Sequence, residues 1–218
     1  MIRLVFAILL TCGICHALDV RFLAWDDDVA ARQIVALSGS SGTEISGLHP
    51  LKRTEAVSMT PAEGELAFNT PDKLTDEGKA AEMKVALGDG IKRPLVILLP
   101  DPKAPTGLRG FALNDNTDAF AWGSYRIINA TPKVLNLAMG KHRLRLPTGW
   151  KAVDVKGDDE ESYPIWMATA DNPQETLYTN VWPSGSDIRR LVFIVPGTDP
   201  RLGPLALKII PEDRRALE

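Results

Sequence analysis

Cysteine is nearly absent from this sequence of 218 residues, which contains only Cys12 and Cys15. Both lie within the first 17 residues, so residues 18–218 have no thiol. Disulfides, Cys-based zinc sites and iron–sulfur clusters are therefore excluded from that part of the chain. A protein that works outside the cell without disulfides must be stabilised by a buried core alone, and these residues suffice for one large domain or two small ones.

Histidine is also scarce, and basic residues are slightly outnumbered by acidic ones. The chain has three histidines, and its 25 basic residues are outnumbered by 28 acidic ones, which gives a net charge of −3 at pH 7. This balance does not favour nucleic acid or an anionic membrane as a partner. Neither His49 nor His142 has another histidine or a carboxylate at a spacing typical of a site, and Ser40 and Ser41 lie in a loop without the strand and helix of a nucleophile elbow. We therefore expect a non-catalytic protein without a cofactor.

The apolar run at the start of the chain is too short to cross a bilayer, which requires about 20 such residues. It covers residues 4–10, follows a single basic residue and precedes small residues that end at Ala17. This order predicts a secretory signal peptide over residues 1–17, cleaved after Ala17. A lipoprotein signal would instead acylate Cys12, but Thr11 is bulkier than the residue that usually precedes such a cysteine. The mature protein is expected in the bacterial periplasm or outside the cell.

Two blocks of the sequence resemble each other at a separation of about 96 residues. Residues 93–102 (RPLVILLPDP) and residues 190–200 (RLVFIVPGTDP) are both apolar runs that end in proline and aspartate. A Gly-containing turn and a further apolar run follow each block. The openings at residues 20–25 and 125–130 also agree. A repeat of this length has the size of a small domain, so we expect a duplicated domain rather than a solenoid.

Short apolar runs separated by Gly, Pro, Asn and Asp occur along the whole sequence and favour strands joined by tight turns. We predict an all-β protein with two tandem immunoglobulin-like β-sandwich domains after the cleaved signal peptide. The first domain is expected over residues 18–115 and the second over residues 119–213, because residues 114–118 are polar and turn-prone. Residues 72–84 show a weak helical pattern interrupted by Gly78, so at most a turn or two of helix is expected there.

Two of the predicted strands, residues 95–99 and 191–195, are apolar at every position. A strand with one face in water would alternate between apolar and polar residues, as residues 83–87 do. Each apolar strand is therefore expected to be covered on both faces, either as a central strand or by the other half of the chain. Burial of the second face of five residues contributes on the order of 3–5 kcal/mol. That is enough to hold two small domains together.

Three aromatic residues in the second half, Trp166, Tyr178 and Trp182, are candidates for ligand binding. Alignment of residues 177–181 with residues 83–87 places Tyr178 and Trp182 on the outer face of a strand, and Trp166 is expected to share that face. Outward rings on a sheet stack against sugar rings in carbohydrate-binding sandwiches. The alternative is that these rings pack against the other half or against a loop.

Two acidic clusters are candidates for metal binding. Asp26, Asp27 and Asp28 follow a predicted strand, and residues 158–161 (DDEE) join two predicted strands. Carboxylate-rich loops bind calcium outside the cell when they also supply backbone oxygens and a tight turn. Neither cluster has the alternating aspartates of a calcium loop, so a solvated loop is the competing interpretation of each.

The second half contains three turn patterns in a fixed order. Residues 125–132 (YRIINATP), 137–141 (LAMGK) and 144–150 (LRLPTGW) form a strand ending in Asn-Ala, a short strand ending in Gly and a strand ending in Pro-x-Gly. This segment of about 30 residues resembles uncharacterised exported bacterial β-sandwich proteins. The resemblance implies the sandwich fold and export, and it implies no activity and no functional residue.

The sequence favours binding over catalysis, because it shows neither a nucleophile–base pair nor a group of metal ligands. The leading hypothesis is a non-catalytic exported envelope protein that binds or scaffolds other proteins. The alternative is a carbohydrate-binding module that uses the outward aromatic residues of the second domain. A third is an enzyme that acts through acidic residues alone, as some glycosidases do. Neither nucleic acid binding nor stable membrane insertion after signal cleavage is expected.

Overall fold

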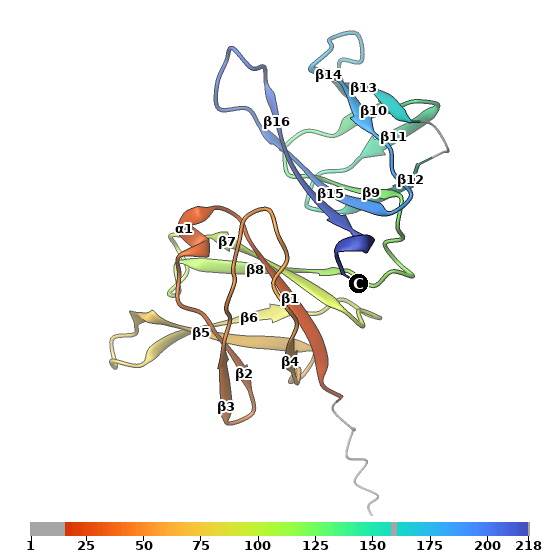
Figure 1. Cartoon of the computed structure of the whole chain (residues 1–218). Helices are drawn as coiled ribbons and strands as arrows, with labels where there is room; N and C mark the ends of the chain where they lie inside the picture. The colour runs from red at the N-terminus through yellow and green to blue at the C-terminus, as the bar shows by residue number, and fades with distance from the viewer. Residues whose placement is uncertain (1–15, 158–160, 218) are drawn as a thin grey trace, which may run out of the picture.

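The computed structural model describes residues 16–157 and 161–217, and Figure 1 shows two domains, one above the other. The described residues form sixteen β-strands, one short α-helix and one turn of 3-10 helix. The chain is all-β with two tandem β-sandwich domains, as the sequence predicts. Residues 1–15 of the predicted signal peptide, with both cysteines, and residues 158–160 of the second acidic cluster lie outside the described residues. Within the described ranges, no helix is long and apolar enough to cross a membrane.

The first domain consists of two four-stranded sheets packed face to face. One sheet has the order β4 (Val57–Met59), β1 (Leu18–Ala24), β7 (Pro94–Pro100), β8 (Leu108–Asn114). The other has the order β3 (Ser41–Glu44), β2 (Val35–Ser38), β5 (Glu65–Leu74), β6 (Ala80–Ala86). The short helix α1 (Asp27–Ala30) follows β1.

The second domain is built in the same way. One sheet has the order β12 (Ala152–Lys156), β9 (Ser124–Asn129), β15 (Ile188–Pro196), β16 (Leu205–Asp213). The other has the order β11 (His142–Leu146), β10 (Leu135–Met139), β13 (Ser162–Thr169), β14 (Tyr178–Pro183). A turn of 3-10 helix, η1 (Arg214–Ala216), follows β16.

The two domains share one strand topology. In each, the first strand pairs in parallel with the seventh, so that β1 lies beside β7 and β9 lies beside β15. The register agrees as well, because Arg21 lies opposite Leu95 in the first domain and Arg126 lies opposite Leu191 in the second. The duplication predicted from the repeated blocks is therefore confirmed, since β7 and β15 occupy equivalent positions.

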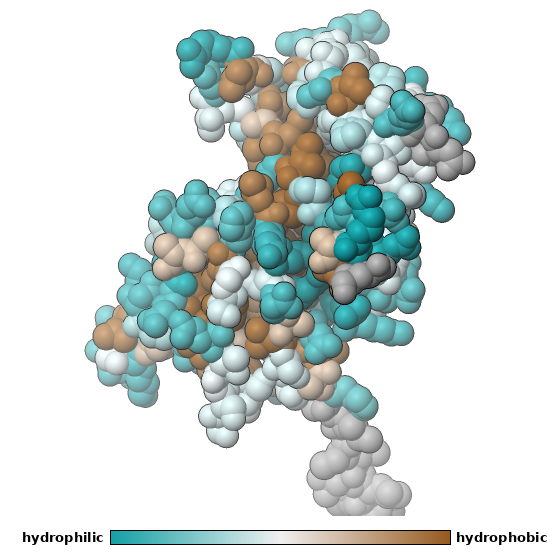
Figure 2. Space-filling model, in the orientation of Figure 1, coloured by the Kyte–Doolittle hydropathy of each residue, from teal (hydrophilic) through white to brown (hydrophobic). Residues whose placement is uncertain are grey.

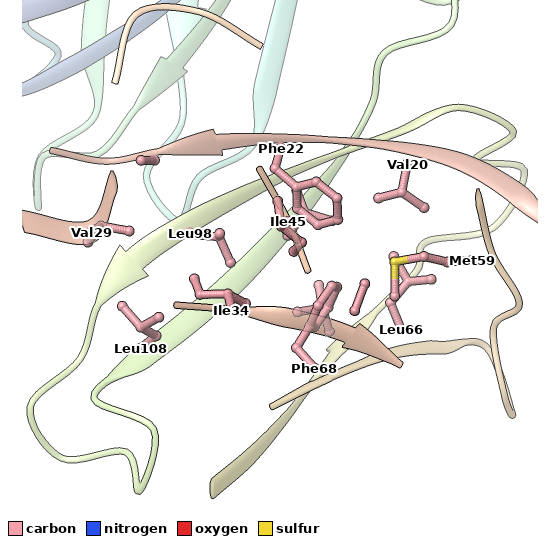
Figure 3. Close-up of a cluster of buried hydrophobic side chains, with 14 residues drawn as sticks. Val20, Phe22, Val29, Ile34, Ile45, Met59, Leu66, Phe68, Leu98 and Leu108 are labelled. Carbon is pink, nitrogen blue, oxygen red and sulfur yellow. The ribbon is translucent and has the colours of Figure 1, made fainter. Parts of the chain in front are cut away.

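The core of the first domain forms between the inner faces of its two sheets. Figure 3 shows Phe22 on β1 pointing towards Phe68 on β5, and the two rings meet edge to face with their centroids 5.7 Å apart. Val20 and Leu66 are buried in the same cluster. The second domain has an equivalent core, with buried residues from β9, β10, β13 and β15. Burial of these apolar side chains is the main stabilising contribution of each sandwich.

A third cluster of buried apolar side chains lies between the two domains. On β7, Leu95, Ile97 and Leu99 belong to this cluster, whereas the alternate residues face the core of the first domain. β15 divides its side chains in the same way. Across the junction, Trp25 meets Phe193 edge to face at 5.3 Å between ring centroids. The prediction that both apolar strands are covered on both faces is confirmed, and for each strand the second cover is the other domain.

Five charged side chains close the same junction and form what we call the interdomain ion cluster: Arg21, Arg53, Asp115, Arg189 and Glu212. Asp115 accepts a hydrogen bond from Arg53 Nε at 3.0 Å, and Arg189 Nη2 lies 2.5 Å from Glu212 Oε2. Arg21 contacts both carboxylates. Burial alone would raise the pKa of Asp115, but Arg53 and Arg189 outweigh it and hold the pKa below its ordinary value. Since β1 and β16 belong to different domains, these pairs fix the domains relative to each other.

The segment between β8 and β9 is part of this junction rather than an exposed polar linker. Asp115 and Phe120 are both buried. Arg189 lies over the ring of Phe120, with Cζ 4.9 Å from the centroid, and its Nη1 donates to the carbonyl oxygens of both residues at 3.0 Å. The turn between the domains is therefore anchored at two points.

Residues 72–84 contain no helix, which agrees with the expectation of at most a turn or two there. The segment forms the end of β5, a turn and the start of β6, with Thr75 N–H donating to Lys79 O at 2.8 Å. Ala81 is fully buried in the domain and Thr70 lies opposite it on β5. A strand forms here despite the weak helical propensity, because burial of every second side chain lets β6 cover the core of the first domain.

Candidate binding sites on the second domain

The outward orientation expected for Trp182 and Tyr178 is wrong. On β14, Trp182 lies opposite the buried Tyr163, and Tyr178 lies opposite the buried Met167. Trp182 is 2 % exposed and stacks on Tyr125, with ring centroids 5.4 Å apart and an interplanar angle of 20°. Tyr178 packs against the same core. Of the three rings proposed for sugar binding, Trp182 is therefore a core residue and Tyr178 is partly buried against the core.

The difference arises because the alignment of β14 with β6 from sequence is shifted by one residue. Side chains of a strand alternate between its faces, so a slip of one position turns every side chain over. The pairing shows that Val85 on β6 lies opposite Leu66, whereas its equivalent on β14 is Asn180, opposite Ile165. The alignment from sequence paired Val85 with Thr179 instead.

Trp166 does face outward, as predicted, and it lines a pocket on the outer face of the sheet β11-β10-β13-β14. The pocket has a volume of about 610 Å³. Its lining residues are Asn136, Leu137, Ala138, Arg143, Leu144, Arg145, Trp166 and Pro173. The loop that follows β13 brings Pro173 over the sheet, and Trp166 Nε1 donates to Thr176 Oγ1 of that loop at 2.8 Å. This hydrogen bond holds the indole ring of Trp166 against the loop that follows β13.

The floor of the pocket follows from the register of three strands. Ala138 on β10 lies between Arg143 on β11 and Trp166 on β13. Because alanine is small, the face of the indole ring and the arginine side chain are left with space between them. In the neighbouring row, Asn136 lies opposite Arg145. One aromatic ring, two arginines and one amide therefore line this outer face around the small side chain of Ala138.

The polar groups at this pocket are largely available to a ligand. Arg143 donates through Nη1 to the carbonyl oxygens of Gly140 and His142, at 2.7 and 2.9 Å, which leaves its other guanidinium nitrogens without a bond to the described residues. Arg145 and Asn136 make no side-chain hydrogen bond or ion pair with any residue in 16–157 or 161–217. The sequence pattern could have indicated these residues, because β10 and β11 alternate strictly and their polar positions share one face.

The three aspartates proposed as a metal site instead begin a helix. Asp26 Oδ1 accepts a hydrogen bond from Val29 N–H at 2.9 Å as the N-cap of α1, and Asp27 and Asp28 form its first turn. Carboxylates are favourable at this end of a helix because of its dipole. The part of the chain that the structure describes contains no group of three or more metal-ligating side chains, and these aspartates, a candidate calcium site from the sequence, supply the cap and first turn of α1.

A second surface of interest is the free edge of β16. In the first domain β6 lies so close to β8 that a Cβ atom on Gly110 would come within 2.2 Å of Val85 Cγ2. By register, the equivalents of Gly110 and Val85 in the second domain are Leu207 and Asn180. Asn180 is exposed although it faces inward, and β14 makes no comparable contact with β16. The first sandwich is closed along this side and the second is open.

On this open side the nine-residue strand β16 has one edge paired with β15 and no strand of the described residues on its other edge. The pairs bracketing β16, Gly197 N–H to Pro204 O and Arg214 N–H to Asp187 O, show that its even-numbered residues bond to β15. The N–H and C=O groups of Leu205, Leu207 and Ile209 therefore point away from the sheet. Leu207 and Ile209 are only partly buried against the core, and Figure 2 shows apolar side chains gathered along this strand.

No protein-family model and no curated protein matches this chain.

Proposed function

We propose that this chain is a non-catalytic, exported protein of the bacterial cell envelope that binds other proteins through the free edge of β16. One observation carries this proposal: the facing sheet leaves the apolar edge strand β16 uncovered, whereas β6 covers β8, the edge strand at the same position of the first domain. Exposed edges of this kind pair with other chains, so proteins normally block them. A retained, open edge is typical of a surface that receives an extended segment.

The other free edge on this side of the domain is blocked. On β14, Val181 N–H is bound by the side chain of Asn180 at 2.7 Å, and Pro183 has no N–H to offer. β16 carries no such block between Leu205 and Ile209, and its own proline, Pro211, ends this stretch of free N–H groups. A partner strand would therefore add to β16 and not to β14.

The first domain shows what kind of segment fits. There the position over Gly110 is filled by β6, which presents Ala81, Met83 and Val85 towards the core at every second residue. A partner segment of the same chemistry, extended and apolar at alternate positions, would cover Leu207 and Ile209 and pair with their backbone groups. The rest of the chain supplies rigidity, because the opposite face of β16 is anchored by Ile210 in the interdomain apolar cluster and by Glu212 in the ion cluster.

Site-specific photo-crosslinking in intact cells tests this function. A photoreactive phenylalanine derivative at position 207 should give a discrete adduct with one protein species. Mass spectrometry should place the bond in a segment with apolar residues at alternate positions. The matched control is position 181, which is 58 % exposed on the outer face of β14 and should give no such adduct. The same products from both positions, or none from position 207, would contradict the proposal.

A further inference from the structure

The pocket beside Trp166 lies on the outer face of the second domain's other sheet, and the protein-binding edge does not use it. Its lining combines one aromatic ring, two arginines and one amide around an apolar floor. We propose that this pocket binds a saccharide that carries a carboxylate, such as a uronic acid unit of an extracellular polysaccharide. This inference is independent of the function proposed for β16.

The aromatic wall has the properties that sugar recognition requires. Sugar rings have apolar C–H faces that stack on flat aromatic surfaces, and indole offers the largest such surface among side chains. The hydrogen bond from Trp166 to Thr176 fixes the ring before a ligand arrives, which lowers the entropy lost on binding. The volume of about 610 Å³ falls within the range of about 300–1,000 Å³ that is usual for small-molecule sites.

The two arginine charges at the pocket favour acidic saccharides over neutral ones. Arg143 and Arg145 lie on one side of Ala138 and Asn136, and Trp166 lies on the other. Arginine binds a planar carboxylate through two parallel hydrogen bonds, and neither guanidinium at this pocket is paired with a carboxylate of the described chain. A neutral sugar would leave both positive charges without a counterion. An acidic sugar would match the ring and the charge together.

Other anions fit the pocket less well. Two arginines at one end of a pocket do not form the continuous basic track that a nucleic acid backbone requires, and the net charge of the chain is −3. A small carboxylate such as acetate would satisfy an arginine but would leave the indole face and the floor at Ala138 uncovered. The amide of Asn136, which can both donate and accept, suits the hydroxyl groups of a sugar.

Isothermal titration with defined oligosaccharides tests the proposal. The probes are a galacturonate tetramer, a neutral galactose tetramer of the same length, and sodium acetate as competitor. We expect the acidic tetramer to bind more tightly than the neutral one, and acetate at equal concentration not to displace it. Binding should weaken as salt increases, because part of it is electrostatic.

Two variants locate the site and one serves as a matched control. Trp166→Ala should weaken binding of the acidic tetramer by about tenfold or more, as for other aromatic anchors. Arg145→Gln should weaken the acidic tetramer but leave any neutral binding unchanged. Val181→Ala, on the same outer sheet face, should bind as the wild type does.

Three results would overturn the proposal. The first is the absence of saturable binding by the folded wild-type protein. The second is equal affinity for the acidic and neutral tetramers. The third is unchanged binding in both Trp166→Ala and Arg145→Gln, which would place any sugar site elsewhere. Because Arg145 is exposed and unpaired with the described chain, its variant is expected to fold even if the tryptophan variant does not.

Discussion

Gly110 in the first domain and Leu207 in the second occupy the same position of equivalent strands, opposite Leu98 on β7 and Ile194 on β15. Gly110 lets Val85 of the second sheet approach its backbone, and the first sandwich closes. Leu207 fills that space with its own side chain, and the inward position across from it is the polar Asn180. One duplicated architecture has thus produced a closed domain and an open one.

The closed side of the first domain depends on the missing side chain of Gly110. Gly110→Ala should lower the free energy of unfolding by about 1–3 kcal/mol, because its Cβ would overlap Val85 in a packed core. Denaturant unfolding measures the change. In the double variant with Val85→Ala, the clash disappears, so the two effects should be less than additive by more than about 0.5 kcal/mol. Additive effects would show that β6 and β8 are not in contact there.

Removal of a carboxylate from the interdomain ion cluster should lower the free energy of unfolding more than removal of a surface carboxylate does. Asp115→Asn leaves Arg53 and Arg189 buried without their main counterion, which should cost about 3–5 kcal/mol. The control is Asp199→Asn, because its partner Arg201 has an 87 % exposed side chain and an ion pair in water contributes little, so a much smaller effect is expected. Equal effects of the two substitutions on the free energy of unfolding would contradict a stabilising role for Asp115 in the buried ion cluster.

Acid should weaken the same junction. The pKa of Asp115 is lower in the folded protein than in the unfolded chain, so its contribution is complete above the unfolded value of about 3.9 and is lost as the pH falls towards the folded value. Melting temperatures between pH 7 and pH 2 should show this loss in the wild type, and a smaller one in Asp115→Asn. A steeper loss in the variant would be inconsistent with a depressed pKa.

Trp182 and Trp166 should respond oppositely to truncation. Trp182→Ala removes a buried ring stacked on Tyr125 and should cost about 3–5 kcal/mol. Trp166→Ala removes a ring at an open pocket and should cost much less. Thermal unfolding of the two variants side by side checks the difference. A larger loss for Trp166 would mean that the register of β13 and β14 is not the one described.

The pattern of the sequence predicts most of the fold but not its open edge. The blocks around Leu95 and Leu191 are apolar at every residue, and this alone indicates that both faces of β7 and β15 are buried. The register of β14 could not be predicted in the same way, because residues 177–182 carry apolar side chains on both faces, so that alternation does not choose between them. The lining of the pocket beside Trp166 also depends on the loop that brings Pro173 back over the sheet, which is a tertiary contact.

Export is a prediction from the first 17 residues, which lie almost entirely outside the described part of the chain. Protein recovered from the periplasm or the medium should begin at Leu18 when its N-terminus is sequenced. Cell fractions should contain little of the uncut chain. A mature protein that begins at Met1, or one acylated at Cys12, would refute a cleaved secretory signal.

The central claim is that β16 receives an extended apolar segment, and a peptide titration tests it most directly. The probe is a fluorescent peptide of residues 80–88, the strand that covers the equivalent position in the first domain. Anisotropy should show saturable binding to the wild-type protein and to the control Val181→Lys. Binding should weaken at least about tenfold, or about 1.4 kcal/mol, in Leu207→Lys. Equal binding by Leu207→Lys and the wild type, or no saturable binding by the wild type, would contradict the account.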